Sequence, residues 1–169
     1  APMHEIDLSL AMKDGMRRLA SGVAVLACHS ADNVRHAMTV SSITSVSDSP
    51  ASLLVCVHEQ TAMHALLEKP GDAFVINILA ANQQDVSNLC AGRDQGECRF
   101  SLGDWQQGFD KQPYLADAQA VFFCRLDKIT NYGTHKIVIG QIAHVMINES
   151  AVDPLIYVDG DYAGFHKLS

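Results

Sequence analysis

Two long apolar runs, AQAVFFCRLDKI at residues 118–129 and KIVIGQIAHVMI at residues 136–147, decide the fold. Both are rich in β-branched and aromatic residues, which suit a pleated and buried surface. Between them, Asn131-Tyr132-Gly133-Thr134 is typical of a turn. The two runs therefore predict a pair of long antiparallel strands around which the rest of the chain packs.

Shorter strands and a few helices are predicted on either side of this pair. Strands are expected at residues 23–28, 35–40, 52–57, 74–79 and 155–158. Helical spacing predicts an opening helix over 8–20 capped by Ser9, a second over 61–68 capped by Thr61, and a third that Asn82 opens and Gly92 ends. Residues 93–112 have little periodicity and are predicted to form a long loop, which in a compact domain is usually functional.

Strands dominate this pattern, and helices and strands do not alternate regularly as they do in a parallel sheet. A mostly antiparallel closed barrel is therefore favoured over a doubly wound sheet. We expect a mainly β fold with peripheral helices, formed as a single domain over residues 1–169.

Composition limits the partners and the compartment. Hydrophobic residues make up 48% of the 169 residues, enough for a substantial core. The net charge of -7 does not suit nucleic acid or anionic lipid, so we expect neither a nucleic-acid nor a membrane partner. Residues Ala1–Glu5 lack the basic start of a signal peptide, and the five scattered cysteines contain no CxxC pair. We expect reduced thiols and a cytoplasmic location.

Several common catalytic and binding motifs are missing from the sequence. It contains no GxGxxG, no phosphate loop ending in Gly-Lys-Ser/Thr, no GxSxG elbow and no HExxH. The eight histidines include no pair at an obvious metal-ligand spacing, so no metal site is predicted. A nicotinamide nucleotide, if bound, is therefore not bound in the Rossmann manner.

The run Met38-Thr39-Val40-Ser41-Ser42-Ile43-Thr44-Ser45 is the most informative stretch for function. Its hydroxyls and backbone amides can hold phosphate or ring heteroatoms without a large positive charge. The same composition also fits a polar edge strand whose hydroxyls bond their own backbone. The residues by themselves leave both interpretations open.

Segments along nearly the whole chain resemble the short-chain flavin reductases, which are FMN-binding split-barrel proteins that serve two-component monooxygenases. The matching segments are RRLASGVAVL at 17–26, MTVSS at 38–42, SVS at 45–47, LLVCV at 53–57, FVINIL at 74–79, CAG at 90–92, RF at 99–100, YGTHKIVIG at 132–140 and PLIY at 154–157. The resemblance implies an antiparallel Greek-key split barrel. It also implies a homodimer that uses NADH or NADPH to reduce FMN or FAD and supplies the reduced flavin to a partner oxygenase.

The resemblance also implies which residues hold the flavin. They are Met38, Thr39, Val40, Ser41, Ser42, Ser45, Val57, His58, Gln60, Thr61, Asn77, Ile78, Leu79, Ala91, Gly92, Arg99, Phe100 and Tyr162. The Val57–Thr61 stretch departs from many relatives, which carry Arg and Ser before the Thr. Gln60 and Thr61 are the remaining donors for a phosphate there.

His135 is the residue that the resemblance places beside the nicotinamide, in a catalytic role. By itself, a histidine at a strand start is more often a solvated turn residue. Thr134 stands where many relatives have Asp, which leaves open what orients the imidazole.

Two other functions are compatible with the same residues. One is a flavoprotein of this fold that reduces another acceptor, such as a corrinoid or a quinone. The other is a flavin-binding protein without enzymatic activity. Bleaching of flavin by NADH or NADPH without air separates an enzyme from a pure binder.

Overall fold

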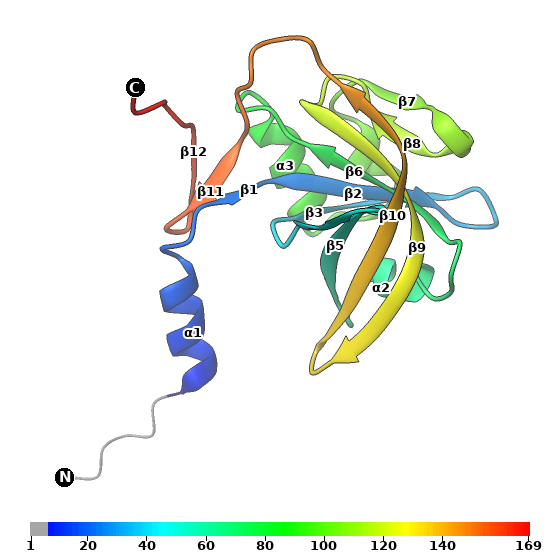
Figure 1. Ribbon diagram of the computed structural model, residues 1–169, viewed down its shortest axis with the longest axis horizontal. Helices are drawn as coiled ribbons and strands as arrows, with labels where there is room; N and C mark the ends of the chain where they lie inside the picture. The colour runs from blue at the N-terminus through cyan, green and yellow to red at the C-terminus, as the bar shows by residue number, and fades with distance from the viewer. Residues whose placement is uncertain (1–6) are drawn as a thin grey trace.

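A computed structural model describes residues 7–169, and β-structure dominates it (Figure 1). The expectation about Ala1–Glu5 lies outside the described residues. Within residues 7–169, no helix is long and apolar enough to cross a membrane.

The main sheet has seven strands, all paired antiparallel. They are β2 (Ala24–His29), β3 (Arg35–Val40), β4 (Thr44–Asp48), β5 (Ala51–His58), β6 (Ala73–Ile78), β9 (Ala120–Tyr132) and β10 (His135–Ile147). Their order across the sheet is β3-β2-β6-β9-β10-β5-β4. Within the described chain β3 and β4 do not pair with each other, so the sheet curls without closing. The split barrel is confirmed, and the fully closed barrel is not found.

The central hairpin is longer than predicted, because its turn is shorter. β9 and β10 pair up to Tyr132 and His135, which leaves only Gly133 and Thr134 in the turn. Gly133 has a φ of 55°, a conformation that costs glycine little. The hairpin tip therefore carries His135 directly at the start of β10.

Gly140 is needed where β10 crosses the barrel interior. A Cβ at this position would collide with the ring of Phe74 and lie 3.2 Å from the Cβ of Cys124. Phe74 is fully buried and cannot move aside cheaply. The register shift between Ile139 and Gly140 lies at this close approach.

Two small sheets flank the main one. β1 (Ser21–Gly22), β11 (Ile156–Val158) and β12 (Asp161–Ala163) form a three-stranded sheet, and β7 (Trp105–Gln107) pairs with β8 (Pro113–Leu115). The predicted loop over 93–112 therefore contains β7 and two short 3₁₀ helices, η1 (Gly96–Phe100) and η2 (Phe109–Lys111). These elements are too short to produce a recognisable periodicity in the sequence.

The helices differ from prediction mainly at their ends. α1 (Leu8–Met16) is capped by Asp7, whose Oδ1 accepts hydrogen bonds from the backbone N–H groups of Ser9 and Leu10, and it ends before Ala20. Ser9 is thus inside the helix, not its cap.

The other two helices keep their predicted places. Thr61 caps α2 (Ala62–Leu66) as predicted, with its hydroxyl accepting from the N–H of His64 at 3.3 Å. α3 (Gln84–Ala91) begins after Asn82 without a side-chain cap, and Gly92 follows its end.

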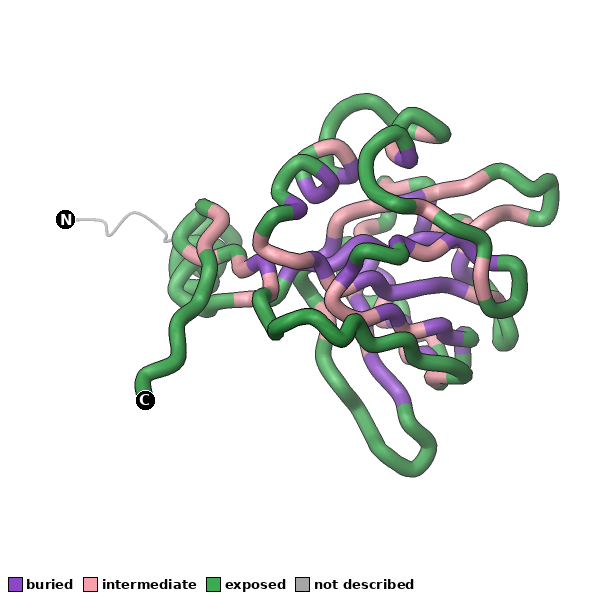
Figure 2. Tube along the Cα trace, turned by 90° about the horizontal axis from the view of Figure 1, so that it is seen from above, coloured by how far each residue is buried: buried purple, intermediate pink, exposed green. Residues whose placement is uncertain are grey.

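Two apolar clusters fill the molecule, one on each face of β2. Val25 and Ala27 belong to one cluster, and Ala24, Leu26 and Cys28 belong to the other. Figure 2 shows the buried residues concentrated in the strands of the main body, with α1 exposed to one side. Burial raises the pKa of the Cys28 thiol to about 12, so it stays neutral and fits the expectation of reduced cysteines.

Candidate functional site

Three adjoining cavities follow the outer edge of β3 and the residues after it. The first, of about 260 Å³, is lined by His36, Ala37, Met38, Thr39, Gln60, Thr61, Ala62, Met63, Cys90, Ala91, Gln95, Gly96 and Arg99. The second, of about 250 Å³, is lined by Val23, Thr39, Val40, Ser41, Ser87, Ala91, Tyr157 and Tyr162. The third, of about 610 Å³, is lined by Lys13, Met16, Arg17, Leu19, Ala20, Ser21, Gly22, Ser41, Ser42, Ile43, Thr44, Tyr157, Val158 and Asp159.

These cavities join into one groove because neighbouring cavities share walls. Thr39 and Ala91 line both the first and the second, and Ser41 and Tyr157 line both the second and the third. We call the whole the β3 groove. It extends from the start of α2, along β3, to the end of α1.

β3 gives the groove its binding chemistry. It is an edge strand of the main sheet, so its backbone N–H and C=O groups on the outer side are not used in a strand ladder. A flavin ring is flat and carries donors and acceptors along its edge, which an unpaired strand edge can match. The residues present therefore fit a flavin, and Met38–Ser42 lie along this edge.

Hydroxyl groups along the groove divide into bound and available ones. The hydroxyl of Ser42 bridges the backbone of Cys56, donating to its carbonyl and accepting from its N–H, both at 3.2 Å. The Thr39 hydroxyl donates to the carbonyl of Ser87 at 2.6 Å. Ser41 is exposed in the groove. The Ser41 hydroxyl is thus open to the groove, whereas that of Ser42 is used to hold β5.

Tyr162 closes one side of the groove from the C-terminal segment. Its hydroxyl lies 2.6 Å from the hydroxyl of Ser87 and 3.1 Å from Oδ1 of Asn88, which fixes the ring against α3. Tyr157, in β11, lines the same wall and stands edge-on to Tyr162 at 5.6 Å.

Arg99 stabilises the end of the groove that the first cavity forms, near the start of α2. Its guanidinium donates to three backbone carbonyls, those of Ala37, Gly92 and Asp94, each at 2.8 Å. These bonds fasten the 92–99 segment onto β3. These bonds use three of the five N–H donors of Arg99, which leaves two for any other partner.

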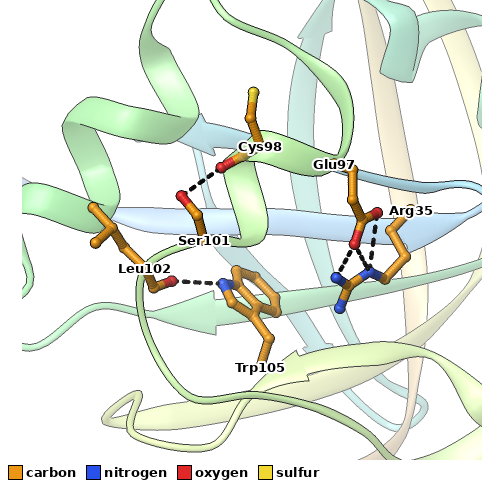
Figure 3. A network of polar contacts seen from close by, with 6 residues as sticks. All are labelled: Arg35, Glu97, Cys98, Ser101, Leu102 and Trp105. Carbon is orange, nitrogen blue, oxygen red and sulfur yellow. Dashed lines mark hydrogen bonds and ion pairs between the residues drawn. The ribbon is translucent and has the colours of Figure 1, made fainter.

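A second set of contacts joins the start of β3 to η1 (Figure 3). Arg35, on β3, forms an ion pair with Glu97 of η1, and its guanidinium carbon lies 4.2 Å above the centre of the Phe100 ring. The hydrogen bond from Arg35 holds the pKa of the Glu97 carboxyl below its usual value. Phe100 is packed edge-on against Trp105, whose indole N–H donates to the carbonyl of Leu102. Phe100 is therefore part of the wall's support and not of its lining.

Several predicted site residues do not line the groove. Val57, Asn77 and Leu79 are fully buried, Ile78 is half-buried, and Ser45 lies on the exposed strand β4. The amide of Asn77 donates to the carbonyl of Val25 at 3.0 Å, and its oxygen accepts from the N–H of Leu115 at 2.9 Å. Both partners of the Asn77 side chain are therefore backbone groups of the protein. Gly92 contributes its carbonyl to Arg99.

His135 lies outside the groove but close to one end of it. It is exposed at the hairpin tip, directly opposite His58 in the β10–β5 pairing. The two rings stand edge-on with centroids 4.9 Å apart. Gln60 and Thr61, which follow His58, line the groove, so the structure brings His135 to its rim.

Tyr157 and Ser87 are groove residues that sequence reasoning did not single out. Tyr157 reaches the groove because β11 pairs with β1, and Ser87 because α3 lies beside β3. Both placements depend on contacts between distant parts of the chain, and no local pattern signals them.

Comparison with known proteins points to the same family that the sequence segments resemble. A family model for the flavin reductase like domain matches residues 16–166. The reductase component of an FADH(2)-dependent resorcinol hydroxylase from Rhizobium sp. is 38% identical over 148 residues, which cover 87% of this chain and 82% of that protein. The FMN reductase (NADH) RutF of Stutzerimonas stutzeri is 32% identical over 152 residues, which cover 90% of this chain and 86% of that protein.

A solved structure of a flavin reductase also superposes closely on this chain. BorF, the flavin reductase component of a bacterial two-component tryptophan halogenase, superposes with a TM-score of 0.84 at 32% identity, over 94% of this chain and 99% of that one. Fold, groove and matches define a split-barrel protein of the flavin reductase class. The chain belongs to the flavin reductase like domain family, as its sequence segments indicated.

Proposed function

We propose that this protein is an NAD(P)H:flavin oxidoreductase that reduces FMN or FAD and supplies the reduced flavin to a partner monooxygenase. The observation that carries the proposal is the β3 groove, a continuous hollow along an unpaired strand edge in a chain of this family. A bound flavin supplies the redox chemistry by accepting a hydride from the nicotinamide. The chain's own task is to hold two ring systems in contact.

Each part of the groove has a separate task in this proposal. The outer backbone of β3 binds the flavin ring edge, and the Ser41 hydroxyl binds a polar group of the flavin. Gln60 and the start of α2 lie at the end where a phosphate fits, since exposed amides and N–H groups can hold an anion. His135 contacts the nicotinamide from the rim.

The activity is tested by mixing protein with FMN or FAD and with NADH or NADPH under anaerobic conditions. Protein-dependent bleaching of the flavin absorbance is expected, followed by release of the reduced flavin, which is reoxidised when a partner oxygenase and air are then admitted. A protein that binds flavin but never bleaches it is a binder and not a reductase. Bleaching without release of reduced flavin points instead to a resident cofactor and another acceptor, such as a corrinoid or a quinone.

Replacing Ser41 with alanine is expected to weaken flavin binding about tenfold while changing the reduction rate at saturating flavin much less. The reason is that a hydrogen bond between neutral groups contributes roughly 0.5–1.5 kcal/mol, and the upper end of that range is about tenfold in affinity. Fluorescence titration gives the affinity. Ser45→Ala is the matched control, because Ser45 is also an exposed serine near the site but does not line the groove. Equal flavin affinity in both variants would remove Ser41 from the site.

We further propose that the protein is a cytoplasmic homodimer and that α1 contributes to its interface. α1 has no buried residue, and Leu8, Met12 and Met16 are 78%, 59% and 52% exposed. These three positions recur every four residues and so form one apolar stripe. A nine-residue helix is not stable in water without packing. A second copy of the chain would cover the stripe.

The double substitution Met12→Glu and Met16→Glu is therefore expected to give monomers at micromolar concentration. Light scattering measures the mass directly. Leu10→Glu is the control, since Leu10 is equally apolar but lies about 160° around the helix from Met12. A wild-type protein that is itself monomeric at micromolar concentration would overturn the dimer. Dimers that survive the double substitution would exclude this face of α1.

A further inference from the structure

Two histidines face each other across the strand pair at the rim of the β3 groove. His58 ends β5, His135 begins β10, and the two are direct partners in the antiparallel register. Their rings meet edge to face, with an interplanar angle of 78° and centroids 4.9 Å apart. Such pairs favour one orientation of each ring over others. The orientation of the His135 ring is therefore coupled to that of His58.

The ring of His58 is itself fixed from the other side. Its Nδ1 accepts a hydrogen bond from the backbone N–H of Gln60 at 3.0 Å. An Nδ1 that accepts must be unprotonated, so in the neutral ring the proton is on Nε2. The backbone carbonyl of His58 also accepts from the hydroxyl of Thr61 at 2.8 Å. His58 is thus built into the turn that brings Gln60 and Thr61 to the groove.

The ring of His135 is held by a second contact from its own strand end. The Thr134 hydroxyl lies 2.9 Å from Nδ1 of His135. The carbonyl of Thr134 accepts from the N–H of Glu59 at 2.9 Å, which ties the hairpin tip to the His58 turn. Because Nδ1 is engaged by Thr134, Nε2 is the nitrogen that His135 can offer to a bound nucleotide.

We propose that His58 is a positioning residue with two separable effects. Its ring sets the orientation of His135 for the nicotinamide, and its Nδ1 orders the turn that presents Gln60 to the flavin. Within residues 7–169, no carboxylate contacts the imidazole of His135. Thr134 and His58 together hold this ring instead. This inference rests on the proposed function, in particular on the role of His135.

Two substitutions separate the two effects. His58→Asn keeps an acceptor near the place of Nδ1 but removes the ring, whereas His58→Phe keeps the ring but removes the acceptor. For His58→Asn we expect a three- to tenfold lower hydride-transfer rate, or a similar rise in KM for NADH, with flavin affinity unchanged. For His58→Phe we expect a three- to tenfold weaker flavin affinity with the hydride-transfer rate at saturating flavin unchanged.

Anaerobic stopped-flow bleaching measures the rate, and fluorescence titration measures the flavin affinity, with circular dichroism to verify the fold of each variant. If His58 acts through His135, the double variant H58N/H135A reduces flavin no more slowly than H135A does. Fully additive losses would overturn the proposal, as would equal losses of rate and affinity in both His58 variants. If H135A itself behaves like wild type, the role of His135 in the proposed function fails. If H135A is slow while H58N is normal, only the positioning role of His58 fails.

Discussion

Replacing Asn77 with alanine is expected to lower the free energy of unfolding by about 1.5–4.5 kcal/mol. Asn77 is fully buried, and its amide bonds the carbonyl of Val25 and the N–H of Leu115. The alanine variant leaves the buried N–H of Leu115 without a partner, which costs about 1–3 kcal/mol. It also removes one of two hydrogen bonds to the Val25 carbonyl, which stays paired in the β2–β6 ladder, at a further cost of about 0.5–1.5 kcal/mol. These bonds also join β2 to β8 through β6, so the loss affects contacts between three strands.

Urea denaturation of the wild type and the variant measures the difference. Asn131→Ala is the matched control, because Asn131 is also a strand asparagine but is exposed near the hairpin tip, and a change within about 0.5 kcal/mol is expected there. Flavin titration of the folded variant adds a second test. An Asn77→Ala protein with wild-type stability and lost flavin affinity would show that the side chain serves the flavin and not the core.

Replacing His135 with alanine is expected to leave flavin affinity nearly intact while slowing hydride transfer, or raising KM for NADH, by about ten- to a hundredfold. Loss of one positioning contact of roughly 1.4–2.7 kcal/mol produces a change of this size. The separation of the two effects follows from the structure, since His135 lies at the rim of the β3 groove and does not line it.

Anaerobic stopped-flow bleaching is the suitable measurement, since it observes reduction before the flavin leaves the protein. His144→Ala provides the control, because His144 is an exposed histidine on the same strand but stacks on Phe109, toward the opposite end of β10. A His135→Ala variant with the wild-type rate and an unchanged dependence on NADH would make His135 a simple turn residue.

The strands were predictable because a strand buried on one or both faces has a recognisable pattern of apolar residues over a short stretch of sequence. The central hairpin, β2, β3, β5 and β6 all lie within a few residues of their predicted positions. β4 was not predicted as a strand, because Thr44–Asp48 is hydroxyl-rich and exposed throughout. Its pairing with β5 is what makes it a strand, and this pairing depends on the turn at Ser49-Pro50.

Helix ends and strand order were harder for physical reasons. Asp7 and Ser9 are both good caps, and the choice between them depends on where the first turn forms. The gap between β3 and β4 depends on how seven strands curl together, which no local stretch encodes.

The residues of the candidate site likewise divide into those that a local stretch of sequence indicates and those that contacts between distant segments bring together. The hydroxyls of Met38–Ser42 singled out a segment that lines the groove, whereas Tyr157 was not singled out because a distant strand pairing brings it there. The hydrogen-bond partners of Asn77 could not be predicted for a related reason. A buried amide among apolar residues needs partners, and the sequence could not show that Val25 and Leu115 supply them.

The unpaired edge of β3 also bears on how the protein behaves in concentrated solution. An exposed strand edge can recruit a strand from another molecule, which is a common start of aggregation. Arg99 protects part of this edge by bonding the carbonyl of Ala37, and α3 lies alongside. A flavin in the groove would shield the rest, whereas its release would bare the edge. Release of flavin to a partner thus periodically removes the protection of this edge.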